Sequence, residues 1–387
     1  MSHPLDDSRI DWSLLKQFGF DEARFRADRE AILAGTLTAT SHVVTGEIKS
    51  APGVVDLDAE DDVVKTAGET ALRNGEVAAV VLNGGMATRF GGVVKGVVEV
   101  FDGKSFIGLK AEDVRRAGSL FGTPVPLVLM NSFATKPATE AHLEDNDYFG
   151  LSKDDVYAFE QSISVRMTPE GDLFIGDDGK PSYHAPGHGD FFSCLRRSGV
   201  LAKLMERGVK YLLFSNVDNL GATVDPIVVG HHVISEKTMT AEVTQKQKTA
   251  SGKWDKGGAP ALLENGHVQV VEGFRFPPDF PQEKLPDFST NNMIFSAAAV
   301  NQDVPLDRYL VEKTVDGRPA LQLETITCEA SGSKDASGAP VFDLGLLRVP
   351  REGVRGRFYP VKEPVDLETN RETLRERLLA GWGELGA

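Results

Sequence analysis

A glycine-rich segment with two cations lies directly after an apolar run. The run covers residues 77–82, and the segment that follows reads NGGMATRFGGVVK, residues 83–95. Gly84 and Gly85 would let backbone N–H groups approach a base or a phosphate, because no side chain stands in the way. Arg89 and Lys95 would supply positive charge to phosphate oxygens. The spacing fits neither G-x-x-x-x-G-K-[ST] nor G-x-G-x-x-G, so the alternative is an ordinary strand and turn with surface cations.

A second glycine-rich segment reads YHAPGHGD, residues 183–190. Its glycines leave backbone N–H groups accessible, His188 can donate to an anion, and the start of the following helix adds a positive dipole. A zinc site is not expected, because Pro186 and the two glycines prevent the helix on which a His-x-x-x-His pair would bind metal. The alternative is a plain strand-to-helix connection with Asp190 as the N-cap residue.

An apolar strand ends in polar side chains in the segment FSNVDNLGAT, residues 214–223. Ligands of open α/β sheets lie beyond the carboxyl ends of the strands, where Asn216 and Asp218 are expected. A single carboxylate there suits Mg²⁺, which keeps most of its waters and takes phosphate oxygens as further ligands. An Asx turn that caps a helix is the alternative.

Further segments carry amides, a carboxylate and a lysine. The segment 288–292 presents Asn291 and Asn292, and the segment QLET at 322–325 presents Glu324. Adjacent amides and a carboxylate can bind the paired hydroxyls of a sugar, although turns have a similar composition. Lys362 ends the segment GRFYPVK and could reach a phosphate, whereas the usual environment of a lone lysine is solvent.

Strands and helices alternate from residue 76 onward. The predicted strands are 78–82, 125–130, 156–159, 211–215 and 240–243, and the predicted helices are 111–120, 134–144, 191–207 and 226–235. This alternation predicts an α/β fold with a mixed, mainly parallel central sheet. We expect residues 1–75 to form a helical segment packed on the core, residues 76–365 the main domain, and residues 366–387 a C-terminal helix.

Composition indicates a globular protein with no nucleic-acid surface and no membrane span. The chain has 387 residues, 41% of them apolar, and a net charge of −15 from 42 basic and 57 acidic residues. The acidic balance argues against nucleic acid as a partner, because such binding needs a basic surface. Two cysteines without a CxxC pair, no signal-peptide pattern and no apolar run of about 18 residues predict a cytoplasmic protein.

Taken together and in this order, the segments resemble the eukaryotic-type UDP-glucose pyrophosphorylases, within the UDP-sugar pyrophosphorylase superfamily. The resemblance covers residues 78–368 and is carried by LNGGMATRFGGVVKG (82–96), VLMNSFAT (128–135), YHAPGHGD (183–190), FSNVDNLGAT (214–223), FSTNN (288–292), VEKTVDGRPALQLET (311–325) and VPREGVRGRFYPVKEPVDL (349–367). It implies a Rossmann-like, GT-A-like nucleotidyltransferase catalytic domain over residues 76–365. It also implies a Mg²⁺-dependent reaction in which UTP and glucose 1-phosphate give UDP-glucose and pyrophosphate.

The reaction implied by this resemblance needs no general base. The sugar 1-phosphate is already an anion, and one of its oxygens would attack the α-phosphorus of UTP in line. The enzyme would bring two polyanions together and stabilise the leaving pyrophosphate with fixed cations.

The resemblance also assigns roles by position. The uracil would lie against the backbone at Leu82, Asn83, Gly84 and Gly85 and against Gln161 and Gly189. Asp218 would hold Mg²⁺, His188 would lie near the sugar phosphate, and Asn216 is expected among the substrate-binding residues. The glucosyl hydroxyls would be bound by Asn291, Asn292 and Glu324, and the catalytic cations would be Lys95, Arg89 and Lys362.

Three positions depart from the family pattern, namely Arg89, Val217 and Ser289. They leave the sugar open, so galactose 1-phosphate and N-acetylglucosamine 1-phosphate are alternatives to glucose 1-phosphate. A UDP-sugar-dependent glycosyltransferase and a sugar-nucleotide sensor are further alternatives, and Lys95 and Lys362 count against both. The expected partners are small-molecule substrates. The chain leaves no room for the family's C-terminal β-helix, so we expect a monomer or a small homo-oligomer that associates in another way.

Overall fold

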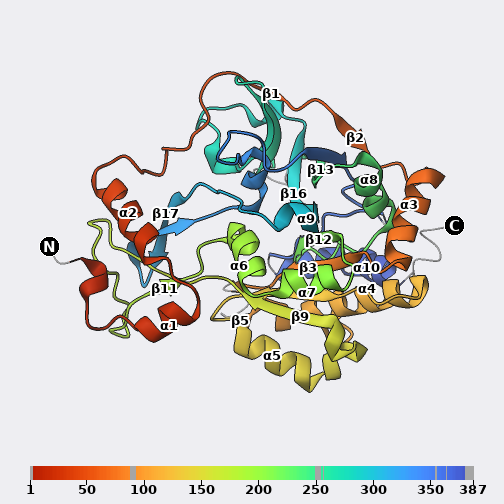
Figure 1. Ribbon diagram of the computed structural model, residues 1–387, viewed down its shortest axis with the longest axis horizontal. Coiled ribbons are helices and arrows are strands. Elements are labelled where there is room, and N and C mark those ends of the chain that lie inside the picture. The colour runs from red at the N-terminus through yellow and green to blue at the C-terminus, as the bar shows by residue number, and fades with distance from the viewer. Residues whose placement is uncertain are drawn as a thin grey trace.

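A central eight-stranded sheet runs through the molecule (Figure 1). The computed structural model describes residues 3–87, 93–248, 254–255, 257–353, 355–362 and 364–379. In spatial order, the strands of the sheet are β2 (Val54–Asp56), β19 (Leu344–Arg348), β13 (Met239–Gln245), β16 (Asp287–Ser296), β12 (Tyr211–Asn216), β3 (Val77–Leu82), β8 (Leu127–Asn131) and β9 (Val156–Glu160).

The sheet is mixed but mainly parallel. Every neighbouring pair of strands is parallel except the two pairs that involve β16, which is antiparallel to both β12 and β13. Strands covered on both faces need near-continuous apolar sequence, and β8 is buried along its whole length. The predicted α/β fold class is therefore confirmed.

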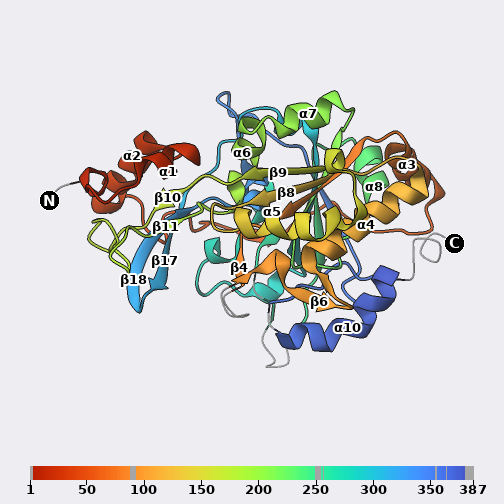
Figure 2. The same ribbon diagram turned by 90° about the horizontal axis from the view of Figure 1, so that it is seen from below.

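Helices cover both faces of this sheet (Figures 1 and 2). The helices are α1 (Trp12–Gln17), α2 (Glu22–Leu33), α3 (Asp62–Arg73), α4 (Phe106–Phe121), α5 (Lys136–Asp145), α6 (Phe191–Arg197), α7 (Val200–Glu206), α8 (Pro226–Ser235), α9 (Ala297–Val300) and α10 (Pro364–Leu379). Side chains of β3 alternate between two cores, because successive residues of a strand point to opposite faces. Ala78 and Val80 share one core with residues of α6 and α7, whereas Val77, Ala79 and Val81 share the other with residues of α3 and α4.

One predicted helix is two helices. Residues 191–207 divide into α6 and α7 at Gly199, whose φ of 75° lies in the left-handed region that ends a helix. The Asp190 side chain does not cap α6. Its carboxylate instead accepts hydrogen bonds from Ser162 N–H at 2.5 Å and from the Cys194 thiol at 3.0 Å.

The N-terminal segment packs on an outer core and also contributes strands. Helices α1 and α2 pack with Ile163, Val165 and Leu321, the last from the hairpin of β17 (Tyr309–Val315) and β18 (Arg318–Glu324). Two strands in this segment were not expected. β1 (Ile48–Ser50) pairs with β14 (Ala259–Leu263), and β2 is the edge strand of the central sheet. The domain boundaries at residues 75 and 365 stay predictions.

The remaining strands form small sheets around the central one. They are β15 (Val268–Val271), which pairs with β14, and the pairs β4 (Met86–Ala87) with β5 (Val93–Val94), β6 (Glu99–Phe101) with β7 (Lys104–Ser105), and β10 (Ser164–Val165) with β11 (Tyr183–His184). The described ranges end in α10 and contain no β-helix. Among the described helices, none has the length and apolar content to cross a membrane.

Candidate active site

A pocket of about 350 Å³ opens at the carboxyl ends of β3, β8 and β12. The parallel register places Leu82 beside Met130 on one side and Asn216 on the other, so the loops after these strands leave from one edge of the sheet. The predicted site residues that line the pocket are Leu82, Gly84, Gly85, Lys95, Gln161, His188, Asn216, Asp218 and Glu324. The fold thus brings together segments that are far apart in the sequence.

Lys95 and Asp218 form an ion pair inside this pocket. Lys95 Nζ lies 2.5 Å from Asp218 Oδ2, and the two side chains are only 15% and 18% exposed. The backbone carbonyl of Asp218 accepts a hydrogen bond from Val361 N–H at 3.0 Å, which anchors the residue after β12. A ligand that carries both a cation and phosphate oxygens could satisfy both charges at once.

Glycine backbone forms one wall of the pocket. A Cβ atom at Gly84 would lie 2.1 Å from Gln161 Oε1, so the amide of Gln161 can sit against the loop only because position 84 has no side chain. Gln161 Nε2 donates to the Gly187 carbonyl at 2.8 Å, and the Ser132 hydroxyl donates to the Gly84 carbonyl at 2.9 Å. These contacts place amide and backbone polar groups along this wall, where they could form hydrogen bonds with the edge of a base.

His188 is held by Thr327. Thr327 N–H donates to His188 Nδ1 at 3.2 Å, and the Thr327 hydroxyl lies 2.8 Å from the same atom. The Thr327 hydroxyl also donates to the His188 carbonyl at 2.7 Å, so Thr327 holds both the ring and the backbone of His188. Burial lowers the pKa of His188, although the carboxylates of Glu272 and Glu324 oppose this effect. The ring is therefore neutral at pH 7, with one N–H to donate.

Glu324 is oriented by polar side chains that sequence reasoning missed. Gln322 Nε2 donates to Glu324 Oε1 at 2.5 Å, and Lys313 Nζ lies 3.5 Å from the same oxygen. Gln322 Oε1 accepts from Arg166 Nε at 2.7 Å, which fixes the orientation of the amide. Gln322 and Glu324 are two residues apart on β18 and therefore share a face. This spacing is the signal that could have identified Gln322.

The two adjacent asparagines of β16 lie in different environments. The register between β13 and β16 shifts here, and Asn291 has a φ of 60°. Its Nδ2 donates to Asn216 Oδ1 at 3.0 Å, at the edge of the pocket. Asn292 lines a second cavity, where its Nδ2 donates to Glu242 Oε2 at 3.3 Å. Neighbouring residues of a strand point to opposite sides, so the fold does not bring both amides to one ligand.

Asn83 and Gly189 support the pocket but are not among its lining residues. Asn83 is buried, and its Nδ2 donates to Asn131 Oδ1 at 2.8 Å. Gly189 N–H donates to the Thr325 carbonyl at 2.9 Å, and a Cβ atom at Gly189 would lie 2.6 Å from the Ile326 nitrogen. Gly189 therefore permits two backbone segments to approach each other.

Of the two remaining predicted cations, Lys362 is not among the residues that line the pocket. Lys362 is exposed and directly follows Val361, whose N–H binds the carbonyl of Asp218. The Lys362 N–H donates to Asp366 Oδ2 at 2.7 Å. Arg89 lies outside the described residues, within the gap at 88–92.

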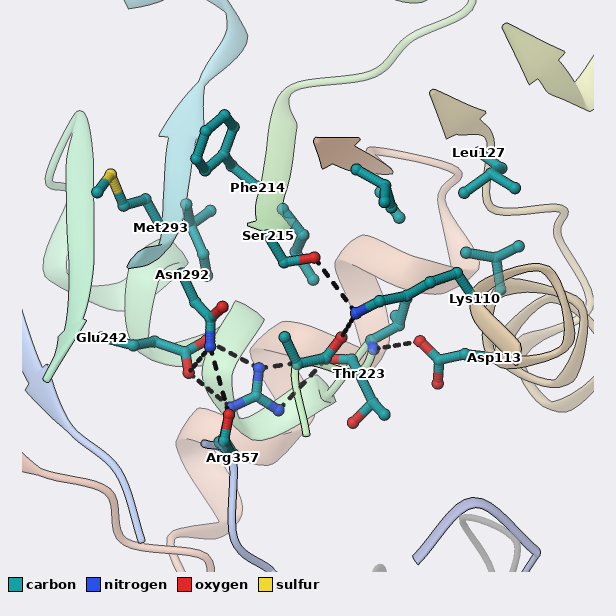
Figure 3. Close-up of a pocket in the computed structure, with 17 residues that line it drawn as sticks. Lys110, Asp113, Leu127, Phe214, Ser215, Thr223, Glu242, Asn292, Met293 and Arg357 are labelled. Carbon is teal, nitrogen blue, oxygen red and sulfur yellow. Dashed lines mark hydrogen bonds and ion pairs between the residues drawn. The ribbon is translucent and has the colours of Figure 1, made fainter. Parts of the chain in front are cut away.

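The second cavity is small, with a volume of about 20 Å³, and charged side chains meet apolar ones in its lining (Figure 3). Arg357 donates to both carboxylate oxygens of Glu242 at 2.8 Å, and these side chains are 2% and 3% exposed. Burial opposes the charge of the guanidinium, but the Glu242 carboxylate outweighs burial and raises the pKa of Arg357. Lys110 of α4 reaches the cavity from the opposite side (Figure 3).

These buried charges were not predicted from the sequence, although the sequence of α4 indicates that Lys110 is buried. Lys110 falls on the buried stripe of α4, four residues after Phe106 and three before Asp113. A lysine on an apolar helical stripe must be paired or held by acceptors, because an isolated buried charge is costly.

Asp218 is the residue whose chemistry fits Mg²⁺. Among the described residues, no group of three or more His, Cys, Asp or Glu side chains could hold a metal ion by itself. Mg²⁺ does not need such a group, since it binds through one or two carboxylates and takes water and phosphate oxygens for the rest. The donor set of the pocket therefore fits a Mg²⁺ ion that arrives with a polyphosphate.

A mainly parallel sheet with a glycine-lined pocket and an ion pair at its carboxyl edge defines an α/β protein of the Rossmann-like class with a ligand pocket at that edge. A family model described as UTP--glucose-1-phosphate uridylyltransferase matches residues 32–376. The chain belongs to the UTP--glucose-1-phosphate uridylyltransferase family.

Individual relatives agree with this assignment. A UTP--glucose-1-phosphate uridylyltransferase from Solanum tuberosum is 33% identical over 316 residues, which are 77% of this chain and 62% of that protein. The protein of the same name from Hordeum vulgare is 32% identical over 347 residues, which are 85% of this chain and 67% of that protein. The chain therefore spans about two thirds or less of the length of these relatives. A solved structure described as UDP-glucose phosphorylase from Trypanosoma brucei has a TM-score of 0.74 at 23% identity, covers 92% of this chain and 77% of that chain, and supports the fold.

Proposed function

We propose that the chain is a UTP–glucose-1-phosphate uridylyltransferase that forms UDP-glucose and pyrophosphate. The observation that carries the proposal is the Lys95–Asp218 ion pair, which shares one pocket with the glycine backbone at 84–85 and the Glu324 carboxylate. The pocket therefore combines a surface for a base, a site for metal and phosphate, and an acceptor for sugar hydroxyls. A nucleotide sugar and its precursors have these three chemical parts.

The base belongs on the glycine side of the pocket. The backbone at 82–85 supplies N–H and C=O groups, and Gln161 lies against Gly84 with its amide fixed by Gly187. An amide that presents both a donor and an acceptor suits the edge of uracil. Asn83 and Gly189 act through the loops that they hold.

The sugar 1-phosphate belongs on the side of Glu324 and His188. The Glu324 carboxylate can accept from glucosyl hydroxyls, and the neutral His188 ring can donate its one N–H to a phosphate oxygen. Asn216 and Asn291 are hydrogen-bonded to each other at the pocket edge, and their amides can add a contact to the sugar phosphate. We propose that Lys362 binds the same phosphate, because the N–H of its neighbour Val361 is hydrogen-bonded to the Asp218 carbonyl.

The proposed chemistry is an in-line displacement at the α-phosphorus of UTP. A sugar-phosphate oxygen forms the new P–O bond, and the bond to the β-phosphate oxygen breaks as pyrophosphate leaves. Lys95 stabilises the charge that develops on the leaving group, and Arg89 is assigned to the same task from the sequence. Mg²⁺, held by Asp218, would supply further positive charge to the phosphate oxygens when bound. We also propose a cytoplasmic location.

A substrate panel tests this function. Purified protein is incubated with Mg²⁺, each of UTP, dTTP, ATP and GTP, and each of glucose, galactose and N-acetylglucosamine 1-phosphate, and pyrophosphate is measured. We expect the fastest release with UTP and glucose 1-phosphate, and none without a sugar phosphate. A Lys95→Met preparation controls for a contaminating enzyme. No release with any pair would contradict the proposal, and faster release with another sugar would change the assigned substrate.

A further inference from the structure

Lys110 is a buried cation with no place in the mechanism described so far. Its side chain is 5% exposed, and its Nζ donates to the backbone carbonyls of Asn219 at 2.8 Å and Ala222 at 2.7 Å. The Ser215 hydroxyl lies 3.4 Å from the same nitrogen. Figure 3 shows the side chain extending from α4 toward Ser215.

This set of acceptors is typical of a site for a monovalent cation. Backbone carbonyls can replace the hydration shell of such an ion, and an ammonium group has three N–H donors for three oxygens. Burial has the largest effect and lowers the pKa of Lys110 to about 8, although the carboxylates of Asp113, Asp218 and Glu242 oppose this effect. Lys110 is thus still mostly protonated at pH 7.

The carbonyls that Lys110 binds belong to the loop directly after Asp218. The same helix also holds the loop through Asp113, whose Oδ2 accepts from Val224 N–H at 2.8 Å. Lys110 and Asp113 are three residues apart, so they lie on one face of α4. The helix therefore offers a donor to one part of the loop and an acceptor to the next, which fixes the path of the chain.

The opposite side of the loop is held by Arg357 and by Asn219 itself. Arg357 donates to the Thr223 carbonyl at 3.2 Å. Asn219 Oδ1 accepts from Tyr359 N–H at 2.9 Å, and its Nδ2 donates to Asn292 Oδ1 at 3.1 Å. Within this framework, the Lys110 ammonium binds the carbonyls of Asn219 and Ala222 and so holds them close to each other.

We propose that Lys110 is a positioning residue whose ammonium occupies a monovalent-cation site and holds the loop that presents Asp218 to the pocket. The role of Asp218 in this proposal rests on the proposed function. The cation site rests only on the hydrogen bonds of Lys110. A purely packing role would require the volume of the side chain but not its charge.

The test uses three variants of the full chain. Lys110→Met keeps most of the side-chain volume and removes the charge. Lys110→Ala removes three carbons and the ammonium, which is the fragment that propylammonium can replace. Lys104→Met is the matched control, because Lys104 is 35% exposed and pairs with Glu112 away from the pocket.

We expect both Lys110 variants to release pyrophosphate roughly 10-fold more slowly than wild type or worse at saturating substrates, as the loss of charged hydrogen bonds would cause. They should also need more Mg²⁺, while Lys104→Met keeps the wild-type values. Propylammonium should restore part of the rate of Lys110→Ala and raise its unfolding temperature without substrates. Tetramethylammonium, which has no N–H donor, should do neither, and Lys110→Met should respond to neither ion.

A wild-type rate in Lys110→Met would overturn the proposal, because volume alone would then suffice. A Lys110→Ala variant that folds but shows no propylammonium effect on rate or unfolding temperature would also overturn it. If Lys110→Ala does not fold, Lys110→Met decides the question. Wild-type protein that releases no pyrophosphate would refute the proposed function instead, and the effect of propylammonium on the unfolding temperature would still test the cation site.

Discussion

Replacing Lys95 with methionine tests the chemistry assigned to the pocket most directly. The change removes one positive charge and keeps an unbranched side chain, so the short element that begins at Lys95 should persist. In the ligand-free protein, the charge that loses its partner is that of Asp218, whose Oδ2 lies 2.5 Å from Lys95 Nζ. In the reacting complex, the charge that loses its partner is the negative charge on the departing pyrophosphate.

The expected size of the effect follows from the partial burial of the pair. Both side chains are less than one fifth exposed. At an effective dielectric constant of about 20, a cation about 4 Å from a unit charge contributes about 4 kcal/mol. Part of this energy is already present with bound UTP, and only the increase at the transition state affects turnover. We therefore expect kcat to fall by about 10²- to 10³-fold, the range measured when one preorganised donor is removed.

The assay is steady-state pyrophosphate release, with the unfolding temperature as a control for folding. Asp218 provides a second control, because removing Lys95 leaves this carboxylate near the phosphates without its partner. If Lys95 served only to neutralise Asp218, the double variant Lys95→Met/Asp218→Asn would recover turnover. We expect no recovery. A double variant with near-normal kcat, or a single variant within about threefold of wild type, would refute the reasoning, since the charge would then contribute less than about 1 kcal/mol.

Three further predictions concern separate features of the structure. Asp218→Asn should raise the Mg²⁺ concentration for half-maximal rate by roughly tenfold or more, and an unchanged Mg²⁺ titration would remove Asp218 from the metal site. Gly84→Ala should weaken UTP binding by roughly tenfold in calorimetry, because its Cβ would lie 2.1 Å from Gln161 Oε1 and displace that amide; unchanged affinity would mean that Gln161 does not contact the base. His184 is buried, and burial lowers its pKa to about 3, so the unfolded chain binds a proton below pH 6.5 that the folded chain does not. Between pH 7.5 and pH 5, wild type should therefore lose about 2 kcal/mol more of its urea-unfolding free energy than His184→Leu, and equal losses would show that His184 is not buried neutral.

The edge of the sheet that carries the pocket could be predicted because its signals are local. Each strand that leads to the pocket is a short apolar run that stops at glycine or at a polar residue, and parallel strands must end at one edge. Lys95 and Asp218 are 123 residues apart, yet each follows such a strand and they meet in an ion pair. The alternation of strands and helices therefore predicted the edge of the sheet, and the resemblance to the family predicted that both residues belong to one site.

Features that depend on the register between strands, or on a single backbone angle, could not be predicted. The adjacent asparagines of β16 looked like one binding unit, but strand alternation sends Asn292 to the inner cavity and the register shift leaves Asn291 beside Asn216. The break between α6 and α7 depends on the left-handed φ of Gly199, and glycine within an apolar helical pattern does not always end the helix. The partners of Lys110 could not be predicted, because they are backbone carbonyls, which leave no trace in the sequence.

The position of β2 at the end of the central sheet has a consequence for how the chain reaches its fold. Asp56 of β2 and Arg348 of β19, which form an ion pair at 2.7 Å, are 292 residues apart. Contacts of such high sequence separation form late, because a long loop must close before they contribute. During synthesis, β2 leaves the ribosome early and has no partner until almost the whole chain has followed. Until β19 has been synthesised, β2 stays unpaired. Once β19 has joined the sheet, its outer edge stays unpaired until β2 pairs with it. Unpaired strands and sheet edges are prone to aggregation. The first strand of the central sheet to be synthesised is thus among the last to pair.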